Sequence, residues 1–314
     1  MNFTILTQPL SGKEKLIYQF KKYIKYVLGK NTYGPNSVIQ SIIGGLSDIQ
    51  DEGETNGYNI NPEERGVYPI VFVPNGIETL RYALNLKKQG KIKHLIAGPN
   101  ISVPKDKNDI CFHPEIDTII APSRWTENYF LSLNPGETRI QIWASGVDDR
   151  GQSNKKECSI LIYKKNCPEE LFEYITRFLT IRNMPYTLIG YGDFKKEDYL
   201  EELNSCQAMI YLQESESQGL ALHEAWMADI PTLIWNRGYW EYQVMEWKDE
   251  KISAPYLTAE CGLFFQGLDE FDAKFAEFTS QLTNYSPRKY SLEHFTNEIA
   301  TRKLLHIIQT TGTK

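Results

Sequence analysis

Three features that assign many chains to a class at first sight are missing here. No apolar run reaches the ~20 residues that a membrane-spanning helix requires. The opening residues, Met-Asn-Phe-Thr-Ile-Leu, lack the basic region of a signal peptide. Positive charge is not in excess, because 34 Lys and Arg stand against 40 Asp and Glu and the net charge is −6. We therefore expect a cytoplasmic protein that does not bind nucleic acid through a broad cationic face.

Cysteine is scarce and irregularly spaced. The five cysteines are Cys111, Cys158, Cys167, Cys206 and Cys261, an odd number without a Cys-x-x-Cys pair or a histidine cluster at zinc spacing. We expect reduced, mostly buried thiols and no metal site. Internal repeats and low-complexity tracts are absent from the sequence as well.

What the sequence does contain is an alternation of strand-like and helix-like segments. Short runs rich in β-branched and aromatic residues are each followed by a turn and a helical pattern, which is typical of parallel α/β units. The predicted strands are Phe3–Leu6, Tyr68–Val73, His94–Ala97, Thr118–Ala121, Ile140–Trp143, Ser159–Tyr163, Tyr186–Ile189, Ala208–Leu212, Thr232–Trp235 and Gly262–Phe265. The best-marked helices are Ile77–Lys88, Pro168–Thr180, Lys196–Asn204 and Gly219–Ala228. This pattern predicts two doubly wound, Rossmann-like sheets.

The chain, at 314 residues, is long enough for two such domains. A polar, glycine-containing stretch that starts at Ser145 has neither strand nor helix period and is expected to link them. We assign residues 1–149 to an N-terminal domain and residues 150–290 to a C-terminal domain. Residues 291–314 are expected to form a helix that packs back on the first domain through an apolar stripe, made of Leu304, Leu305 and Ile308.

One strand is joined to its helix through a polar loop. Ala208–Leu212 is predicted to be a buried strand, and the loop Gln213–Gln218 leads to a helix at Gly219. Ligands of open parallel sheets bind at this edge. The first amides of the helix, near Gly219 and Leu220, carry the positive end of the helix dipole and suit a diphosphate.

Two glutamates flank the start of this helix. Glu224 lies among apolar residues, so its carboxylate needs hydrogen-bond partners. The hydroxyl groups of a ribose next to a bound diphosphate could supply them. Glu216 would face the same site from the loop, where it could contact a sugar, and Glu214 is a competing candidate in that loop.

The spacing of Glu216 and Glu224, with seven residues between them and Ala225 and Pro231 downstream, resembles the Glu-x7-Glu signature of glycosyltransferase family 4 and related retaining enzymes. Ser145-Gly-Val-Asp148 is similar to the Gly-Val-Asp that ends the first domain of this family, and Gly190-Tyr-Gly192 stands where its second C-domain glycine loop lies. The resemblance implies the GT-B fold, with two Rossmann-like domains facing across a cleft. It also implies transfer of a sugar from a nucleoside diphosphate sugar to a glycan or lipid-linked acceptor hydroxyl in cell-surface polysaccharide or lipopolysaccharide assembly. Retained configuration, no cofactor and no obligatory metal follow from the same resemblance.

The resemblance assigns roles to residues by position. Glu216 and Lys165 would be catalytic, and binding of the sugar donor would fall to Glu224, Gly219, Leu220, Gln218, Lys164, Tyr191 and Gly192. The family's paired Arg and Lys are matched only by Lys164 and Lys165, because no Arg lies in Ile162–Cys167. In the first domain, the predicted strand ends and helix starts Asn75, Gly76, Asn100 and Arg124 would line the cleft or bind the acceptor.

Several alternatives stay open. A sugar-nucleotide epimerase or a non-catalytic nucleotide-sugar-binding protein could share this architecture. His94 or His113 could be the histidine that many relatives place near the sugar, whereas His223 is expected to pack in the interior. Asn36 or Ser37 is the expected cap of a helix over Val38–Leu46.

The segment Lys13–Lys30 has six lysines against one glutamate, interleaved with apolar and aromatic residues. A basic amphipathic helix of this kind can lie on an anionic membrane, here the inner membrane face. Alternatively, the helix packs its aromatic face on the first domain, and we favour this second interpretation. Membrane attachment would favour a lipid-linked acceptor.

Overall fold

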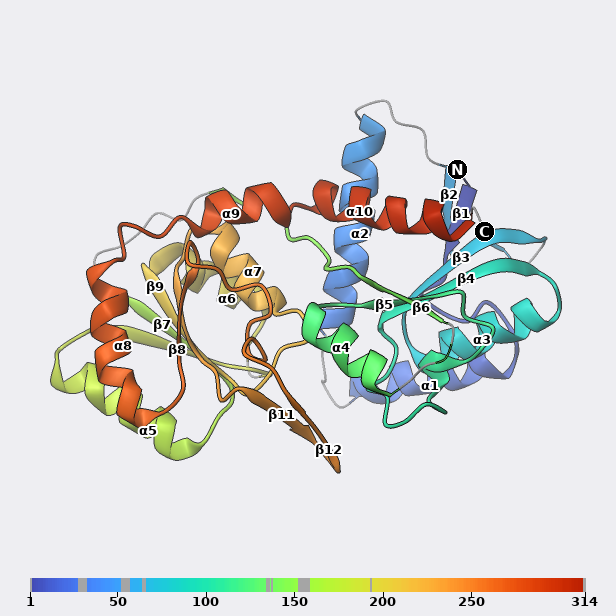
Figure 1. The fold of residues 1–314 in the computed structure, drawn as a ribbon. Coiled ribbons are helices and arrows are strands. Elements are labelled where there is room, and N and C mark those ends of the chain that lie inside the picture. The colour runs from blue at the N-terminus through green and yellow to red at the C-terminus, as the bar shows by residue number, and fades with distance from the viewer. Residues whose placement is uncertain are drawn as a thin grey trace. The chain divides into compact units, whose positions relative to one another are not determined.

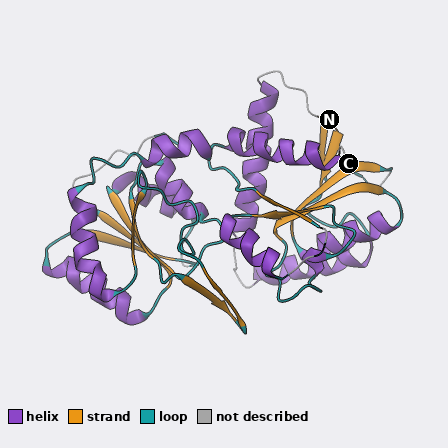
Figure 2. Cartoon of the chain, in the orientation of Figure 1, coloured by secondary structure: helices purple, strands orange, loops and turns teal. Residues whose placement is uncertain are grey.

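The computed structural model contains two compact α/β units (Figures 1 and 2). It describes residues 2–27, 33–51, 57–63, 66–133, 136, 138–151, 159–192 and 194–312. Unit 1 comprises Met1–Gly146 together with Asn297–Lys314, and unit 2 comprises Val147–Thr296. The chain therefore leaves unit 1 once and returns to it once. The domain boundaries expected from the sequence, at 149 and 290, lie near these two crossings.

Unit 1 is built on a six-stranded parallel sheet in the order β2-β1-β3-β4-β5-β6. Its strands are β1 (Asn2–Ile5), β2 (Gly57–Ile60), β3 (Tyr68–Asn75), β4 (Ile92–Asn100), β5 (Thr118–Ala121) and β6 (Arg139–Ile142). Its helices are α1 (Gly12–Val27), α2 (Tyr33–Asp51), α3 (Ile77–Lys88), α4 (Arg124–Ser132) and α10 (Asn297–Gly312), with a 3-10 turn η1 (Ile110–Phe112). The central strands β3 and β4 each contain a buried apolar run, Ile70–Val73 and Leu95–Ala97, as expected for parallel strands covered on both faces.

The last helix, α10, completes the core of unit 1. Leu304, Leu305 and Ile308 are buried, and the helix packs against α2, β3 and β4. Gly45 of α2 permits this close approach, because a Cβ there would lie 2.2 Å from the carbonyl oxygen of Asn297. The sheet on which unit 1 is built thus depends on residues from both ends of the chain.

Unit 2 is built on a five-stranded parallel sheet in the order β13-β10-β9-β7-β8. Its strands are β7 (Ile160–Asn166), β8 (Tyr186–Gly190), β9 (Ala208–Gln213), β10 (Thr232–Trp235) and β13 (Gly262–Phe265). Its helices are α5 (Glu169–Ile181), α6 (Lys196–Ser205), α7 (Leu220–Met227), α8 (Leu268–Ser280) and α9 (Pro287–His294), and an antiparallel hairpin of β11 (Tyr239–Tyr242) and β12 (Met245–Lys248) follows β10. Alternate strand residues enter two cores: Ile162 packs with α5 and α8, whereas Tyr163 faces α6 and α7.

Each sheet reverses its strand order once. The chain goes from β1 outward to β2 and returns to β3, and it goes from β7 outward to β8 and returns to β9. We call the carboxyl ends of β1 and β3, and those of β7 and β9, the reversal points of units 1 and 2. The prediction of two doubly wound, Rossmann-like sheets is confirmed.

The structure differs from the sequence-based expectation in several elements. Strand β2, the β11–β12 hairpin and helix α4 were not predicted. Helix α2 begins at Tyr33, so Asn36 and Ser37 lie inside it and the prediction that one of them caps a helix is wrong. Helix α1 covers most of the basic segment 13–30, whose last residues lie outside the described part.

The described cysteines, Cys111, Cys167, Cys206 and Cys261, are free, and three of them are buried. Cys158 lies outside the described residues. In the part of the chain that the structure describes, no helix is both long and apolar enough to cross a bilayer. Among the described residues, there is no group of three or more His, Cys, Asp or Glu side chains that could hold a metal ion.

Candidate functional site

The reversal point of unit 2 carries charged side chains on both of its strands. Strand pairing sets Tyr163 of β7 opposite Tyr211 of β9, and the two rings stack with centroids 5.0 Å apart. The register of β7 with β9 shifts between Lys164 and Asn166, and the contacts of Lys165 with Glu216 and Tyr191 set the direction of its side chain. The loop after β9, which contains Glu216, comes up beside it.

Glu216 is held by two hydrogen-bond donors. Its Oε1 accepts from Lys165 Nζ at 2.8 Å and from the Tyr211 hydroxyl at 2.6 Å, and its backbone N–H donates to the carbonyl of Ile252 at 2.9 Å. The Glu216 side chain is only 11% exposed. A carboxylate fixed at both its backbone and its side chain offers a preorganised acceptor at the sheet edge.

Lys165 keeps its proton in this setting. Burial alone would lower the pKa of Lys165, but the negative charge of Glu216 and its hydrogen bond raise that pKa above the ordinary lysine value. The phenol of Tyr211 also stays protonated, because burial raises its pKa strongly. The reversal point of unit 2 therefore holds a fixed cation next to a fixed anion.

Tyr191 and Gly192 come from the turn after β8, on the other side of β7. The Tyr191 ring centroid lies 4.7 Å from Lys165 Nζ, close enough for a cation–π contact. The backbone N–H of Tyr191 donates to the Lys164 carbonyl at 2.8 Å, while half of the side chain is exposed. Gly192 has a φ of 97°. The structure thus brings Tyr191 to the Lys165–Glu216 pair, with Gly192 next to it in the turn.

Lys164 lies elsewhere. Its Nζ is 2.6 Å from Glu169 Oε2 and 3.9 Å from the ring centroid of Phe172, both on α5. Lys164 thus packs on α5, whereas Lys165 contacts Glu216 and Tyr191. The structure therefore does not bring Lys164 to Glu216, and its predicted contact with the sugar donor has no support from this position.

Helix α7 begins at the same edge. Gly219 is buried and has the left-handed torsions φ 89° and ψ 56°, which favour glycine, and no side chain caps the helix. A Cβ added at Gly219 would lie 3.7 Å from Glu216 Cβ. Leu220 is the first helical residue, and the preceding Gln218 is buried. The positive end of the α7 dipole therefore lies next to Glu216.

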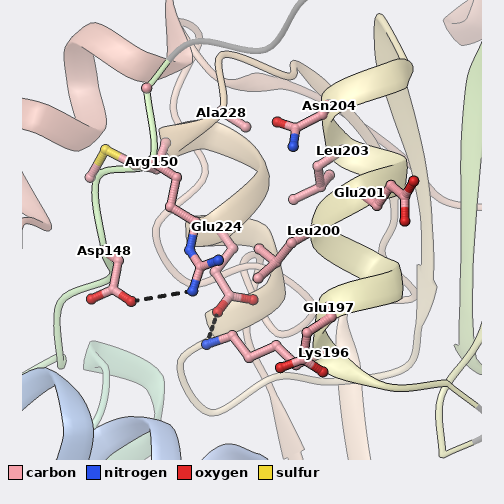
Figure 3. A pocket seen from close by; sticks show the side chains of 12 residues that line it. Asp148, Arg150, Lys196, Glu197, Leu200, Glu201, Leu203, Asn204, Glu224 and Ala228 are labelled. Carbon is pink, nitrogen blue, oxygen red and sulfur yellow. Dashed lines mark ion pairs between the residues drawn. The ribbon is translucent and has the colours of Figure 1, made fainter.

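Glu224, further along α7, faces a pocket of about 230 Å³ between α6, α7 and the segment after Asp148 (Figure 3). Its Oε1 lies 2.7 Å from Lys196 Nζ, and its side chain is 14% exposed. Burial raises the pKa of Glu224, while the positive charges of Lys196 and Arg150 act in the opposite direction. Arg150 also pairs with Asp148 at 3.7 Å. The pocket thus holds a carboxylate that is partly desolvated and countered by two cations.

Three residues of this edge were missed from the sequence: Tyr211, Lys196 and Arg237. Arg237 Nη1 lies 3.4 Å from Glu214 Oε1, and its guanidinium lies 4.0 Å from the ring centroid of Tyr239. Glu214 also accepts from Asn166 Nδ2 at 2.8 Å, so it belongs to a network separate from the one around Glu216. A signal was available, since Lys196 opens a predicted helix and Arg237 lies two residues after a predicted strand, the places where parallel sheets present ligand-binding side chains.

The predicted site residues of unit 1 occupy the carboxyl ends of its central strands. Asn75 ends β3 opposite Asn100, which ends β4, and the backbone N–H of Gly76 donates to the Asn100 carbonyl at 3.1 Å. Gly76 then opens α3. Arg124 is the first residue of α4, where it is mostly exposed and pairs with Glu127. The structure brings Asn75, Gly76 and Asn100 together, while Arg124 makes its ion pair within its own helix.

The histidines do not contribute a catalytic group to these edges. His94 lies near the amino end of β4 and lines a pocket with Thr118, the first residue of β5. His113 precedes β5, so neither histidine lies at the carboxyl end of a strand, and the hypothesis of a sugar-contacting histidine stays a prediction. His223 is fully buried against Trp226, Tyr256 and Phe295, and burial lowers its pKa to about 3. Its expected packing role is confirmed.

Comparison of the sequence with known proteins finds no matching family model and no matching curated protein. Solved structures do match. The lipopolysaccharide outer core galactosyltransferase WaaB, in its apo form, is 11% identical with a TM-score of 0.57, and 99% of each chain is covered. Sucrose-phosphate synthase from Thermosynechococcus elongatus is 9% identical with a TM-score of 0.54, over 99% of this chain and 98% of that one. The chain has the GT-B fold.

A third structure, TarM from S. aureus, is 12% identical with a TM-score of 0.50. The match covers 76% of this chain and 55% of TarM, so the chain spans little more than half the length of that protein. At such identities the likeness establishes the fold, and the chemistry of the site must be inferred from the residues themselves.

Proposed function

We propose that this chain is a retaining glycosyltransferase of the family 4 type. It would transfer a sugar from a nucleoside diphosphate sugar to an acceptor hydroxyl in the cytoplasm, without an obligatory metal. The observation that carries this proposal is the pair of glutamates around α7: Glu216, fixed by Lys165 and Tyr211 at the reversal point of unit 2, and Glu224, facing a pocket further along the same helix. The first backbone amides of α7, which suit an anion, lie between Glu216 and Glu224 in the sequence.

Each part of this edge matches one part of a nucleotide sugar. The first amides of α7 and the Lys165 ammonium suit the diphosphate. Glu224 suits the ribose, because a carboxylate accepts hydrogen bonds from neighbouring hydroxyl groups, and Lys196 at 2.7 Å helps to keep it ionised. Glu216, beside the helix start, suits the hydroxyl groups of the transferred sugar.

The chemistry follows from these charges. The bond between the anomeric carbon and a diphosphate oxygen breaks, the electron pair leaves with the diphosphate, and the acceptor oxygen forms the new bond as its proton passes to the departing diphosphate oxygen. Negative charge develops on the diphosphate, where the α7 amides and Lys165 stabilise it without having to reorganise. A metal ion is not needed for this neutralisation.

The neighbouring structures support the choice of substrate class. The S. aureus TarM structure contains UDP and alpha-GlcNAc-glycerol, and the starch synthase IV catalytic domain from Arabidopsis thaliana, with a TM-score of 0.52, is bound to ADP and acarbose. WaaB is a lipopolysaccharide galactosyltransferase by name. We therefore propose a glycan or lipid-linked acceptor in the assembly of cell-surface polysaccharide or lipopolysaccharide.

A thermal-shift screen against UDP-, GDP- and ADP-sugars tests binding of the sugar donor, because a ligand that binds only the folded state raises the melting temperature. The wild type should respond to one nucleotide class. Glu224→Ala should weaken that affinity by at least about tenfold, since a hydrogen bond to a charged group contributes roughly 1.5–3 kcal/mol. Glu173→Ala, which removes an exposed glutamate of α5, is the matched control and should keep the shift. An unchanged response of Glu224→Ala would contradict the assignment.

Product analysis separates sugar transfer from its alternatives. With the sugar donor alone, a glycosyltransferase should hydrolyse it slowly, whereas an epimerase would convert it to an isomeric nucleotide sugar without any acceptor. Glu216→Gln should abolish the hydrolysis while donor binding persists. A wild-type protein that binds the sugar donor and releases no free sugar would instead be a non-catalytic binding protein.

A further inference from the structure

Helix α1 of unit 1 turns an apolar stripe away from the protein. Leu16, Phe20 and Tyr23 are 68%, 65% and 65% exposed, and Ile24 is 40% exposed. Their spacing of four, three and one residues sets them on one face of the helix. The expectation that the aromatic face of this helix packs on the first domain is therefore wrong for these four residues, which we call the α1 stripe.

The orientation of α1 is set by contacts on its other side. Helix α1 packs beside α3 (Figure 1). Asn85 Nδ2 of α3 donates to Glu14 Oε1 at 3.1 Å, and Lys21 forms an ion pair with the nearly buried Glu78. Tyr18 packs on this side as well, and burial raises its pKa. Polar contacts thus hold α1 with the α1 stripe facing outward, the reverse of an ordinary surface helix, whose apolar face covers the core.

Exposed lysines lie at the end of the α1 stripe and on the polar face of the helix. At 3.6 residues per turn, Lys13 falls at the N-terminal end of the stripe, and Lys15 and Lys22 lie on the polar face, beyond the Tyr23 edge of the stripe. All three are exposed. The one acidic residue of α1, Glu14, faces α3 instead. The helix therefore combines an apolar stripe with a basic polar face, on a chain whose net charge is −6.

We propose that α1 docks unit 1 onto an anionic lipid bilayer. The α1 stripe would enter the boundary between headgroups and acyl chains, and Lys13, Lys15 and Lys22 would contact lipid phosphates, as in other helices that lie in the membrane plane. The helix has 16 residues, a length of ~24 Å at the α-helical rise, and the lysines along it rule out an orientation across the bilayer. The proposal rests on α1 alone and holds whether or not the protein transfers sugars.

Vesicle co-sedimentation tests this proposal with the full chain. Wild-type protein should bind vesicles of phosphatidylcholine mixed with phosphatidylglycerol and should bind pure phosphatidylcholine far less. Leu16→Ser with Phe20→Ser should weaken binding to the anionic vesicles by at least about tenfold, because two apolar side chains lose their burial. Val67→Ser with Leu131→Ser is the matched control, since these exposed apolar residues of unit 1 lie outside α1. That control should bind as the wild type does.

A second pair of variants tests the charge. Lys15→Gln with Lys22→Gln should weaken binding to anionic vesicles by about tenfold or more at low salt, and added salt should reduce this difference. Lys105→Gln with Lys107→Gln, two exposed lysines of the same unit, should have no such effect. Melting temperatures and the shift caused by the sugar donor should be unchanged in every variant, so a failure here is distinguishable from a failure of the proposed function.

Two results would overturn the proposal. One is a vesicle experiment without the expected difference. Either the wild-type protein stays in solution with anionic vesicles, or Leu16→Ser with Phe20→Ser sediments with them as the wild type does. The other is a wild-type protein that self-associates through α1, seen as a loss of oligomers in the serine variant without any effect on vesicles. That outcome would make the α1 stripe a contact between protein chains.

Discussion

The two sheets reverse their strand order in the same way, yet their reversal points hold different side chains. In unit 1, Thr7 follows β1 and exchanges hydrogen bonds with Asn61: its backbone N–H donates to Asn61 Oδ1 at 2.9 Å, and its Oγ1 accepts from Asn61 Nδ2 at 2.7 Å. In unit 2, the Lys165–Glu216 ion pair joins the end of β7 to the loop after β9, whereas the Thr7–Asn61 contact joins the ends of β1 and β2. The contact in unit 1 is neutral and the contact in unit 2 is charged.

This difference shows what the topology determines and what it leaves to the residues. A reversal of strand order separates two neighbouring carboxyl ends and creates a place for a ligand in both units. In unit 1, Thr7 and Asn61 satisfy each other beside the end of β1. In unit 2, a cation and an anion are held in place beside the start of α7, where they offer fixed charge to a polar ligand.

The largest expected effect comes from removing the cation at the charged reversal point. Lys165→Met should lower the turnover number for sugar transfer by about 100-fold or more, the size measured when one preorganised charge-stabilising group is removed. Lys164→Met changes the neighbouring residue, which packs on α5, and should alter turnover by less than about threefold. The turnover numbers of Lys165→Met and Lys164→Met, measured with saturating sugar donor, are compared with that of the wild type.

Equal losses of turnover in Lys165→Met and Lys164→Met would contradict the conclusion that Lys165 lies at the site and Lys164 does not. A circular-dichroism melt of each variant is the control, because Lys165→Met also leaves the buried Glu216 with one hydrogen-bond donor fewer.

The next effect concerns the pH dependence of sugar-donor binding. The pKa of Glu224 is raised by burial, and only its ionised form accepts hydrogen bonds from ribose hydroxyls at both oxygens. The dissociation constant should therefore rise as pH falls through this raised pKa, by up to about tenfold per pH unit. Calorimetric titration over a pH series measures this slope. Glu224→Gln should bind the sugar donor more weakly, and its dissociation constant should not depend on pH in this range. If the pH dependence persists in Glu224→Gln, a group other than Glu224 is responsible for it.

The third prediction concerns stability in acid, through the buried side chain of His223 on α7. In the unfolded chain His223 takes up a proton near its ordinary pKa, whereas in the fold burial lowers that pKa to about 3. Its contribution to stability is therefore present above the ordinary pKa and is lost as pH falls toward 3, by up to ~1.4 kcal/mol per pH unit. His223→Phe should flatten the dependence of the unfolding free energy on pH. His306→Gln, an exposed histidine of α10, should leave that dependence as it is.

The smallest effect is expected at the neutral Thr7–Asn61 contact of unit 1. Asn61 has a φ of 45°, so glycine is tolerated there, and Asn61→Gly removes both side-chain hydrogen bonds to Thr7. Chemical denaturation should show a loss of about 1–2 kcal/mol in unfolding free energy. Sugar-donor affinity should not change, and a tenfold loss of affinity would show that the reversal point of unit 1 also contributes to donor binding.

The sequence was sufficient for the sheets because their strands are short, apolar and bounded by turns. Strands such as Thr118–Ala121 and Thr232–Trp235 are buried on both faces, so composition alone identifies them. Strand β2 was missed because Gly57–Ile60 is a polar edge strand with alternating exposure. Helix α4 was missed because its buried aromatic residues are mixed with polar ones.

The site could be predicted in part. The spacing of Glu216 and Glu224 and the strand, loop and glycine before α7 were readable in the sequence, but the partners of these residues were not. The choice between Lys164 and Lys165 could not be made from strand alternation, because the register of β7 with β9 shifts between Lys164 and Asn166. The Lys196–Glu224 pair and the Arg237–Glu214 pair join segments far apart in the chain, and single-sequence patterns do not specify such contacts.

The α1 helix shows a different limit. Its pattern identifies an apolar side and a basic side, but a pattern does not tell whether the apolar side is covered. Here the contacts of Glu14 and Lys21 with α3 decide the orientation, and those contacts depend on the fold of unit 1.

The route of the chain between the two units has a consequence for protein synthesis. The exit and the return run side by side, because the Val147 N–H donates to the Phe295 carbonyl at 2.9 Å and Val147 pairs with Thr296. Unit 2 is complete once Thr296 has left the ribosome, whereas unit 1 must wait for α10, which follows Thr296 in the chain. We expect the second unit to fold first during translation, with the sheet of unit 1 left uncovered along α2, β3 and β4 until then.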